Sequence, residues 1–213
     1  MRDPILENLN KPKQYWYIDG LAEIVGGGVI LILGITFLLG ALVESRGFDQ
    51  SWYFSVGQFI LVILFAWGSK ILLRHLKTRI TYPRTGYVEY RNRGVSGRWS
   101  RALLAFIIAF SFSALMGIVG KYIPERYEPM IMSLILALLV CYLAMFIGLP
   151  RFYLIAAATF LTGIGLAYIN PGGNWPYAWL FCLEGSFWIV SGVFVLRRYL
   201  KHTRPISEED ADA

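Results

Sequence analysis

Six long apolar stretches alternate with short polar or charged ones along the chain of 213 residues. A helix that crosses a bilayer needs about 20 mostly apolar residues, and backbone that faces lipid must satisfy its own hydrogen bonds. The expected spans are residues 21–43, 52–73, 102–120, 130–148, 152–169 and 177–199. The pattern predicts an all-α integral membrane protein, a six-transmembrane-helix bundle over residues 21–199. Residues 1–20 form a cytoplasmic or interfacial segment, and residues 200–213 form a cytoplasmic tail.

Lysine and arginine fall almost entirely on one side of this arrangement. With an even number of spans, both termini share a side, and that side holds seventeen of the 20 basic residues. The other side holds only Arg46, Lys121 and Arg126. Because loops rich in Lys and Arg stay in the cytoplasm, we expect a multi-pass protein of the cell (inner) membrane with both termini cytoplasmic.

Composition agrees with an integral membrane protein and argues against binding of nucleic acid. The chain is 56% hydrophobic and 16% charged, with a mean hydropathy of +0.52, whereas soluble domains are about 25% charged. No polar segment is long enough to form a separate soluble domain with its own core. The net charge of +6 is therefore a signal of topology rather than of nucleic-acid binding. We expect membrane lipid as a partner and no nucleic acid.

The longest polar segment inside the chain, residues 74–101, lies between the second and third expected spans. Within it, residues 80–91 read ITYPRTGYVEYR, and the turn-forming PRTG between β-favouring residues predicts a short β-hairpin. The basic and aromatic candidates for contact with anionic lipid or a protein partner are Arg79, Tyr82, Arg84, Tyr87, Arg91 and Arg93. Each basic residue near the surface contributes about 1 kcal/mol toward anionic lipid. The alternative is that these charges only enforce topology.

Three stretches carry a resemblance to a known class of protein. They are YPRTGYV at Tyr82 to Val88, WYIDGLAE at Trp16 to Glu23, and GSFWIVSGVFVLRRYL at Gly185 to Leu200. They resemble small six-helix bacterial inner-membrane proteins that carry no assigned activity. The Gly-rich helix openings and the final Ser-Gly step are also similar to the six-helix acid-resistance membrane proteins, from which the YPRTGYV loop departs. The resemblance implies the six-helix layout and supplies no catalytic or binding residue.

The sequence lacks the motifs of enzyme chemistry. Neither His75 nor His202 has the spaced His, Cys, Asp or Glu companions of a metal site. No phosphate-binding GxxxxGK[ST] loop and no GxSxG serine elbow is present. Gly26-Gly27-Gly28 lies inside the first span without a following Lys, which indicates helix packing. We expect no metal, no cofactor and no catalytic residue, and an enzyme only through a site that the sequence does not pair.

Small residues mark a packing face on the first span. At 100° per residue, Glu23, Gly27, Gly34 and Ala41 share a narrow face along which another backbone can approach closely. Glu23 lies near the cytoplasmic end, where it can reach the interface or pair with Lys or Arg. Lys70, at the same depth on the second span, is its predicted partner.

Glu184 is the strongest candidate for function because a carboxyl group inside a span is costly unless something compensates it. The polar residues expected at nearly equal depth in the outer half of the bilayer are Thr36, Gln58, Ser113 and Thr162. We expect Glu184 to face the bundle interior near Thr162, because the short connection 170–176 makes the last two spans antiparallel neighbours, and near Gln58 by depth. The alternative is that Ser and Thr bond only their own helices. Ordinary helix packing would then explain the face shared by Thr159, Thr162, Gly163 and Asn170.

Two functional hypotheses result. In the first, the protein binds or transports a small solute, or is a membrane subunit of a transporter, through the outer-leaflet polar layer centred on Glu184. In the second, a non-catalytic scaffold engages a protein partner or anionic lipid through the basic segment 74–101. A water-accessible cavity at Glu184 favours the first, and a sealed bundle with an ordered exposed loop favours the second.

Overall fold

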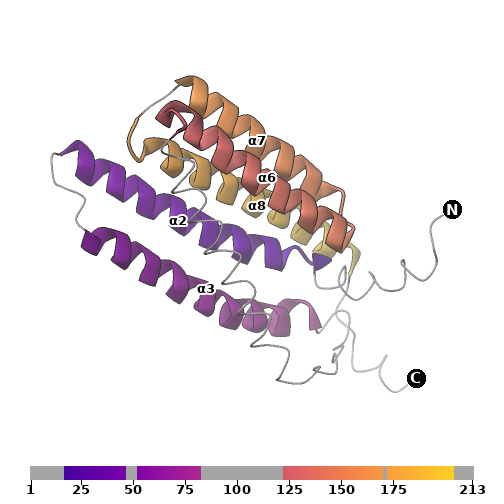
Figure 1. The fold of residues 1–213 in the computed structure, drawn as a ribbon. Coiled ribbons are helices and arrows are strands. Elements are labelled where there is room, and N and C mark those ends of the chain that lie inside the picture. The colour runs from indigo at the N-terminus through magenta and orange to yellow at the C-terminus, as the bar shows by residue number, and fades with distance from the viewer. Residues whose placement is uncertain (1–16, 47–51, 83–121, 170–171, 204–213) are drawn as a thin grey trace, which may run out of the picture.

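The computed structural model describes residues 17–46, 52–82, 122–169 and 172–203, and every regular element in this part of the chain is a helix (Figure 1). The helices are α2 (Leu21–Ser45), α3 (Trp52–Ile80), the short 3-10 helix η1 (Glu125–Tyr127), α6 (Glu128–Ile147), α7 (Arg151–Ile169) and α8 (Trp175–His202). The described part of the chain is therefore all-α.

Among the described residues, four helical segments are long and apolar enough to cross a membrane. They are Leu21–Ser45, Glu125–Ile147, Arg151–Ile169 and Trp175–His202. The remaining long helix, α3, contains the second expected span, and the third expected span at 102–120 lies outside the described residues. These helices support the class of integral membrane proteins. The expected number of six spans stays a prediction.

Helix α3 continues past the expected end of its span at residue 73. It runs to Ile80, because the stretch after Leu73 contains no helix breaker before Pro83. Lys77 and Arg79 lie in its last turn, where positive charge complements the helix dipole. Ile80 is thus helical rather than the start of a β-hairpin, and Arg79 is an exposed helical residue.

Tyr82 lies at the end of the described stretch that follows α3. The other loop candidates, Arg84, Tyr87, Arg91 and Arg93, lie outside the described residues, as do the turn of the expected hairpin and Ser113. Contact of this segment with lipid or a partner therefore stays a prediction.

The helices form one bundle in which α2 packs along α8 and α6 packs along α7 (Figure 1). Helix α7 also contacts α8, and α3 lies against α2. Helix α2 begins and α8 ends at the same end of the bundle. This end, called the basic end below, also carries the end of α3 and the start of α7.

The contact between α2 and α8 depends on glycines that bring the two backbones together. A Cβ atom on Gly34 would lie 2.5 Å from the backbone nitrogen of Cys182, and one on Gly27 would lie 2.8 Å from the carbonyl oxygen of Gly185. On the facing helix, a Cβ atom on Gly185 would lie 2.6 Å from the nitrogen of Leu31. The small-residue face predicted on the first span is therefore the face that meets α8.

A second close approach joins α6 and α7. A Cβ atom on Gly163 would collide with the side chain of Ser133, and Ser133 is fully buried. The Ser133 hydroxyl donates to the carbonyl oxygen of Met130 on its own helix at 2.8 Å. Gly163 thus serves the packing role expected of it, against α6.

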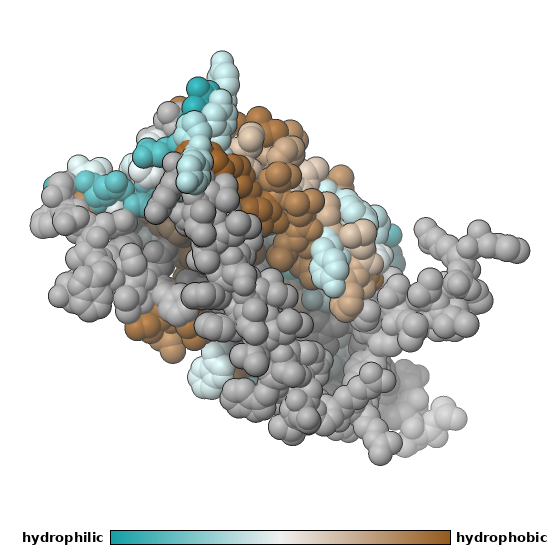
Figure 2. All heavy atoms as spheres, viewed as in Figure 1, coloured by the Kyte–Doolittle hydropathy of each residue, from teal (hydrophilic) through white to brown (hydrophobic). Residues whose placement is uncertain are grey.

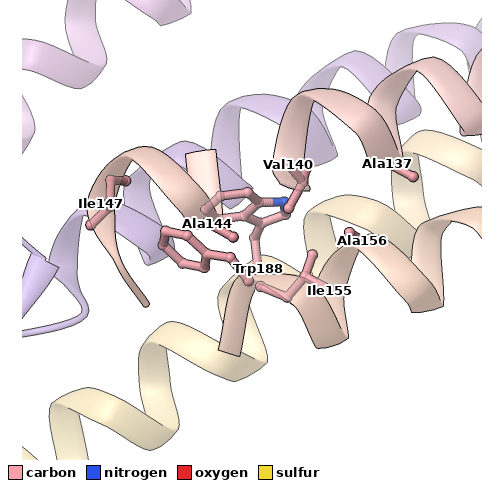
Figure 3. Packing of buried hydrophobic residues seen from close by; sticks show 8 residues of the cluster. Ala137, Val140, Ala144, Ile147, Ile155, Ala156 and Trp188 are labelled. Carbon is pink, nitrogen blue, oxygen red and sulfur yellow. The ribbon is translucent and has the colours of Figure 1, made fainter. Parts of the chain in front are cut away.

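Apolar side chains from three helices meet around Trp188 of α8 (Figure 3). The indole lies among Val140 and Ala144 of α6 and Ile155 of α7. The ring of the fully buried Phe152 lies 5.0 Å from it between centroids. This core fixes the orientation of the Trp188 indole ring and thereby of its N–H group.

Apolar side chains also cover the outside of the helices. Figure 2 shows a band of hydrophobic residues over the described helices, with polar side chains gathered toward the ends. Large apolar residues such as Leu154, Val190 and Phe194 are 67 to 74% exposed. Large contiguous apolar patches are rare on soluble monomers, and this surface suits a lipid environment.

Candidate functional site

Glu184 lies inside the bundle, and only 3% of its surface is exposed. Trp188, one turn later on α8, donates a hydrogen bond from Nε1 to Oε1 of Glu184 at 2.8 Å. The hydroxyl of Thr159 on α7, also buried, contacts Oε2. Both partners are neutral, and within the part of the chain that the structure describes Glu184 forms no ion pair. A carboxyl group in such surroundings is retained most easily as the neutral acid.

The hydrogen bonds around Glu184 suit both of its protonation states. Oγ1 of Thr159 also lies 2.9 Å from the carbonyl oxygen of Ile155, but the hydroxyl has a single proton to donate. When Glu184 is ionised, Thr159 and Trp188 both donate to the carboxylate. When Glu184 is protonated, it donates to Thr159, which in turn donates to Ile155. Rotation of one hydroxyl therefore accommodates the uptake or release of a proton.

Thr159 takes the place expected for Thr162, one turn away on the same helix. The reason is that α8 begins at Trp175, with Pro176 in its first turn, and not at Tyr177. Because Glu184 is nine residues into α8, the matching depth on the antiparallel α7, which ends at Ile169, falls next to Thr159. The hydroxyl of Thr162 donates instead to the carbonyl oxygen of Ala158 at 2.9 Å.

The other members of the expected polar layer are only partly described. Thr36 is buried on α2 and donates to the carbonyl oxygen of Leu33 at 2.7 Å. Gln58 lies on α3, but the structure does not describe its side chain. Ser113 lies outside the described residues. The site that the structure assembles is therefore Glu184, Thr159 and Trp188, from α8 and α7.

A second buried carboxyl group, Glu23, lies near the basic end and has a cationic partner. Its side chain is fully buried, and Nη2 of Arg151 donates to its Oε1. The hydroxyl of Ser191 on α8 donates to Oε2 at 2.8 Å, and Nη2 of Arg151 also donates to the carbonyl oxygen of Tyr17 at 2.8 Å. The expected partner Lys70 is exposed instead, so the pair joins α2 to the start of α7 rather than to α3.

A third buried carboxyl group, Asp19, connects the start of α2 to the end of α3. Its Oδ2 lies 3.2 Å from Nζ of Lys77 and accepts a hydrogen bond from the hydroxyl of Thr81 at 2.7 Å. Its Oδ1 accepts a hydrogen bond from the backbone N–H of Leu21 at 3.1 Å, one of the N–H groups at the start of α2 that have no partner within the helix. Burial lowers the pKa of Lys77, and the negative charge of Asp19 opposes that shift.

Asp19, Arg151, Thr159 and Trp188 are the participants that sequence reasoning did not assign. Asp19 directly precedes Gly20 and an apolar run, which is a recognisable helix-start signal. Arg151 was counted only among the basic residues that indicate topology, so its pairing with Glu23 was not predicted.

Tyr17 belongs to the cluster around Glu23 through its carbonyl oxygen, which accepts a hydrogen bond from Arg151. Burial, and then the charge of Glu23, raise the pKa of the Tyr17 hydroxyl.

A cavity of about 270 Å³ adjoins the site through Trp188. Residues of α2, α3, α6, α7 and α8 line it, including Lys70, Phe152 and Trp188. Trp188 thus lines the cavity and also donates its N–H to Glu184. Glu184 itself does not line this cavity. No group of three His, Cys, Asp or Glu side chains placed to hold a metal occurs among the described residues.

Comparisons with protein-family models, with curated proteins and with solved structures found no match to this chain.

Proposed function

We propose that this chain is a polytopic inner-membrane protein that binds or transports a small solute, or forms a membrane subunit of a transporter, with Glu184 as its proton-exchanging group. The observation that carries the proposal is the neutral environment of this buried carboxyl group. Intramembrane carboxyl groups are costly, and those without a structural counter-ion are typical of proton and solute sites. Asp19 and Glu23 differ because their cationic partners give them a structural role.

The cavity beside Trp188 supports a solute of modest size. At about 30 Å³ per water molecule, its volume corresponds to roughly nine waters. Lys70 and Trp188 line it, so the space offers both a cation and an aromatic surface. Trp188 donates to Glu184 in both protonation states, but more strongly to the carboxylate than to the neutral acid. This hydrogen bond is the route by which proton and solute would influence each other.

The first test is a screen for solutes that stabilise the purified protein. We expect one class among small amines, alkali cations and short carboxylates to raise the melting temperature of the wild type. A ligand at 100 times its Kd contributes about 2.7 kcal/mol. Glu184→Gln, which keeps the shape and removes the proton exchange, should fold and lose this response.

Glu184→Leu separates this proposal from a purely structural role. If Glu184 only holds α7 and α8 together, replacing it by an apolar residue should leave the solute response unchanged and stabilise the protein slightly. That combination would contradict the proposal.

The proposal includes six spans with both termini in the cytoplasm. In support of it, the second half of α3 contains Lys70, Arg74, Lys77 and Arg79. Arg151 and the C-terminal end of α8, which is also rich in basic residues, lie at the same end of the bundle. Arg46 and Arg126 are the described basic residues toward the other end. Such an asymmetry is typical of a cytoplasmic basic end.

Labelling of single cysteines tests this orientation. In a background without Cys141 and Cys182, a cysteine at the 84% exposed Tyr122 should react with an impermeant maleimide in intact cells. Cysteines at Asn92 and Lys201 should react only after the cells are opened. The reverse pattern would show that the basic end is external.

A further inference from the structure

A groove lies between α7 and α8 on the outside of the bundle, and Glu184 does not line it. Its volume is about 1280 Å³. Most of its wall is apolar, with Leu154 and Ala158 from α7 and Phe187, Val190 and Phe194 from α8. Leu154, Val190 and Phe194 are 67 to 74% exposed, so this wall faces the surroundings of the bundle.

The groove is positively charged where it reaches the basic end. Arg151, Arg198 and His202 line it there. Arg198 is exposed and forms no ion pair within the part of the chain that the structure describes. Nε of Arg151 is buried and has no hydrogen-bond partner in the described structure, although Nη2 of the same guanidinium is held by Glu23 and Tyr17.

The side chain of Arg151 is 26% exposed although Glu23 and the carbonyl oxygen of Tyr17 hold its Nη2. A guanidinium donates to phosphate oxygens in a planar, bidentate geometry. The Glu23 carboxylate neutralises only part of the local charge, because Arg198 adds a second cation. An anion at this end would balance the charge.

The apolar wall decides which anion fits. A free phosphate ion would leave the groove beside Leu154, Val190 and Phe194 unfilled, whereas a phospholipid places its phosphate at the arginines and an acyl chain along the wall. The basic end of the bundle is also the level at which headgroups of one leaflet would lie. Basic pockets between membrane helices are known to take anionic headgroups.

We propose that the groove between α7 and α8 binds one anionic phospholipid, with its phosphate at Arg151 and Arg198 and an acyl chain along Leu154, Val190 and Phe194. Because Arg151 also holds Glu23, the bound lipid would contact the junction of α2, α7 and α8. Neither Glu184 nor any of the described residues 74–82 lines this groove.

The test is native mass spectrometry of delipidated full-length protein in detergent. The probes are dioleoylphosphatidylglycerol, dioleoylphosphatidylcholine and glycerol 1-phosphate. We expect one phosphatidylglycerol per chain to be retained in preference to phosphatidylcholine, and glycerol 1-phosphate not to compete. Arg198→Gln should weaken retention about fivefold, from the loss of one charge contact. Val190→Trp, which fills the exposed wall, should reduce binding of both phospholipids.

Arg197→Gln is the matched control, because Arg197 is an exposed neighbour that does not line the groove. It should bind phosphatidylglycerol as the wild type does, and so should Glu184→Gln. The proposal would be overturned if the two phospholipids bound equally, or if Arg197→Gln and Arg198→Gln had the same effect. Competition by glycerol 1-phosphate would assign the groove to a soluble phosphate. A wild-type dimer that Val190→Trp separates would assign it to a second copy of the chain.

Discussion

Arg151→Leu is expected to destabilise the protein by about 3–5 kcal/mol, the usual cost of removing one partner from a buried ion pair. The loss is large because Glu23 is fully buried and would retain, among the described residues, only Ser191 as a polar partner for its carboxyl group. The carbonyl oxygen of Tyr17 would lose its hydrogen bond as well. Unfolding in mixed micelles, followed by circular dichroism, measures the change.

The double variant Glu23→Leu/Arg151→Leu tests whether the cost arises from the unpaired charge. It should be clearly more stable than Arg151→Leu alone, because apolar residues often replace a buried pair at little cost. Arg197→Leu, on an exposed position, controls for loss of surface charge. Equal stability of Arg151→Leu and Arg197→Leu would show that the pair contributes nothing.

Gly34→Leu is expected to be the second most damaging change, at about 3 kcal/mol, the upper end of the usual range for overpacking. A side chain at this position would meet the backbone of α8, with Cys182 nitrogen at 2.5 Å from the first added atom. Backbone cannot move aside as a flexible side chain can, so α2 and α8 would have to separate. The melting temperature in detergent reports the loss.

Gly28→Leu is the control, because no atom lies within 4 Å of a Cβ placed on Gly28 of the same helix. It should melt close to the wild type. A melting temperature unchanged by Gly34→Leu would contradict the packing of α2 against α8.

The packing face of α2 was predictable because helical periodicity alone defines it. The partner helix was not predicted, although the sequence contains a usable signal. Gly20, Gly27 and Gly34 recur every seven residues, as do Gly185 and Gly192 on α8, and the structure places these two series against each other. Matching repeats of small residues on two spans would have indicated the pair.

The partners of the buried carboxyl groups were harder to predict because they depend on tertiary neighbours. Lys70 was chosen for Glu23 by depth on the adjacent span, but α2 packs most closely on α8, and Arg151 reaches Glu23 from the start of α7. For Glu184 the error was two residues at the helix start. Proline is favoured in the first turn of a helix, so counting from Trp175 would have identified Thr159.

Infrared difference spectroscopy on lipid films of the protein, titrated from alkaline to acid pH, tests the role of Glu184 most directly. We expect a carboxylic-acid C=O band that grows on acidification in the wild type and is missing from Glu184→Gln. Thr159→Val should shift this band, because it removes the hydroxyl that contacts Oε2. Identical pH-dependent spectra of the wild type and Glu184→Gln would contradict the proposal that Glu184 exchanges a proton.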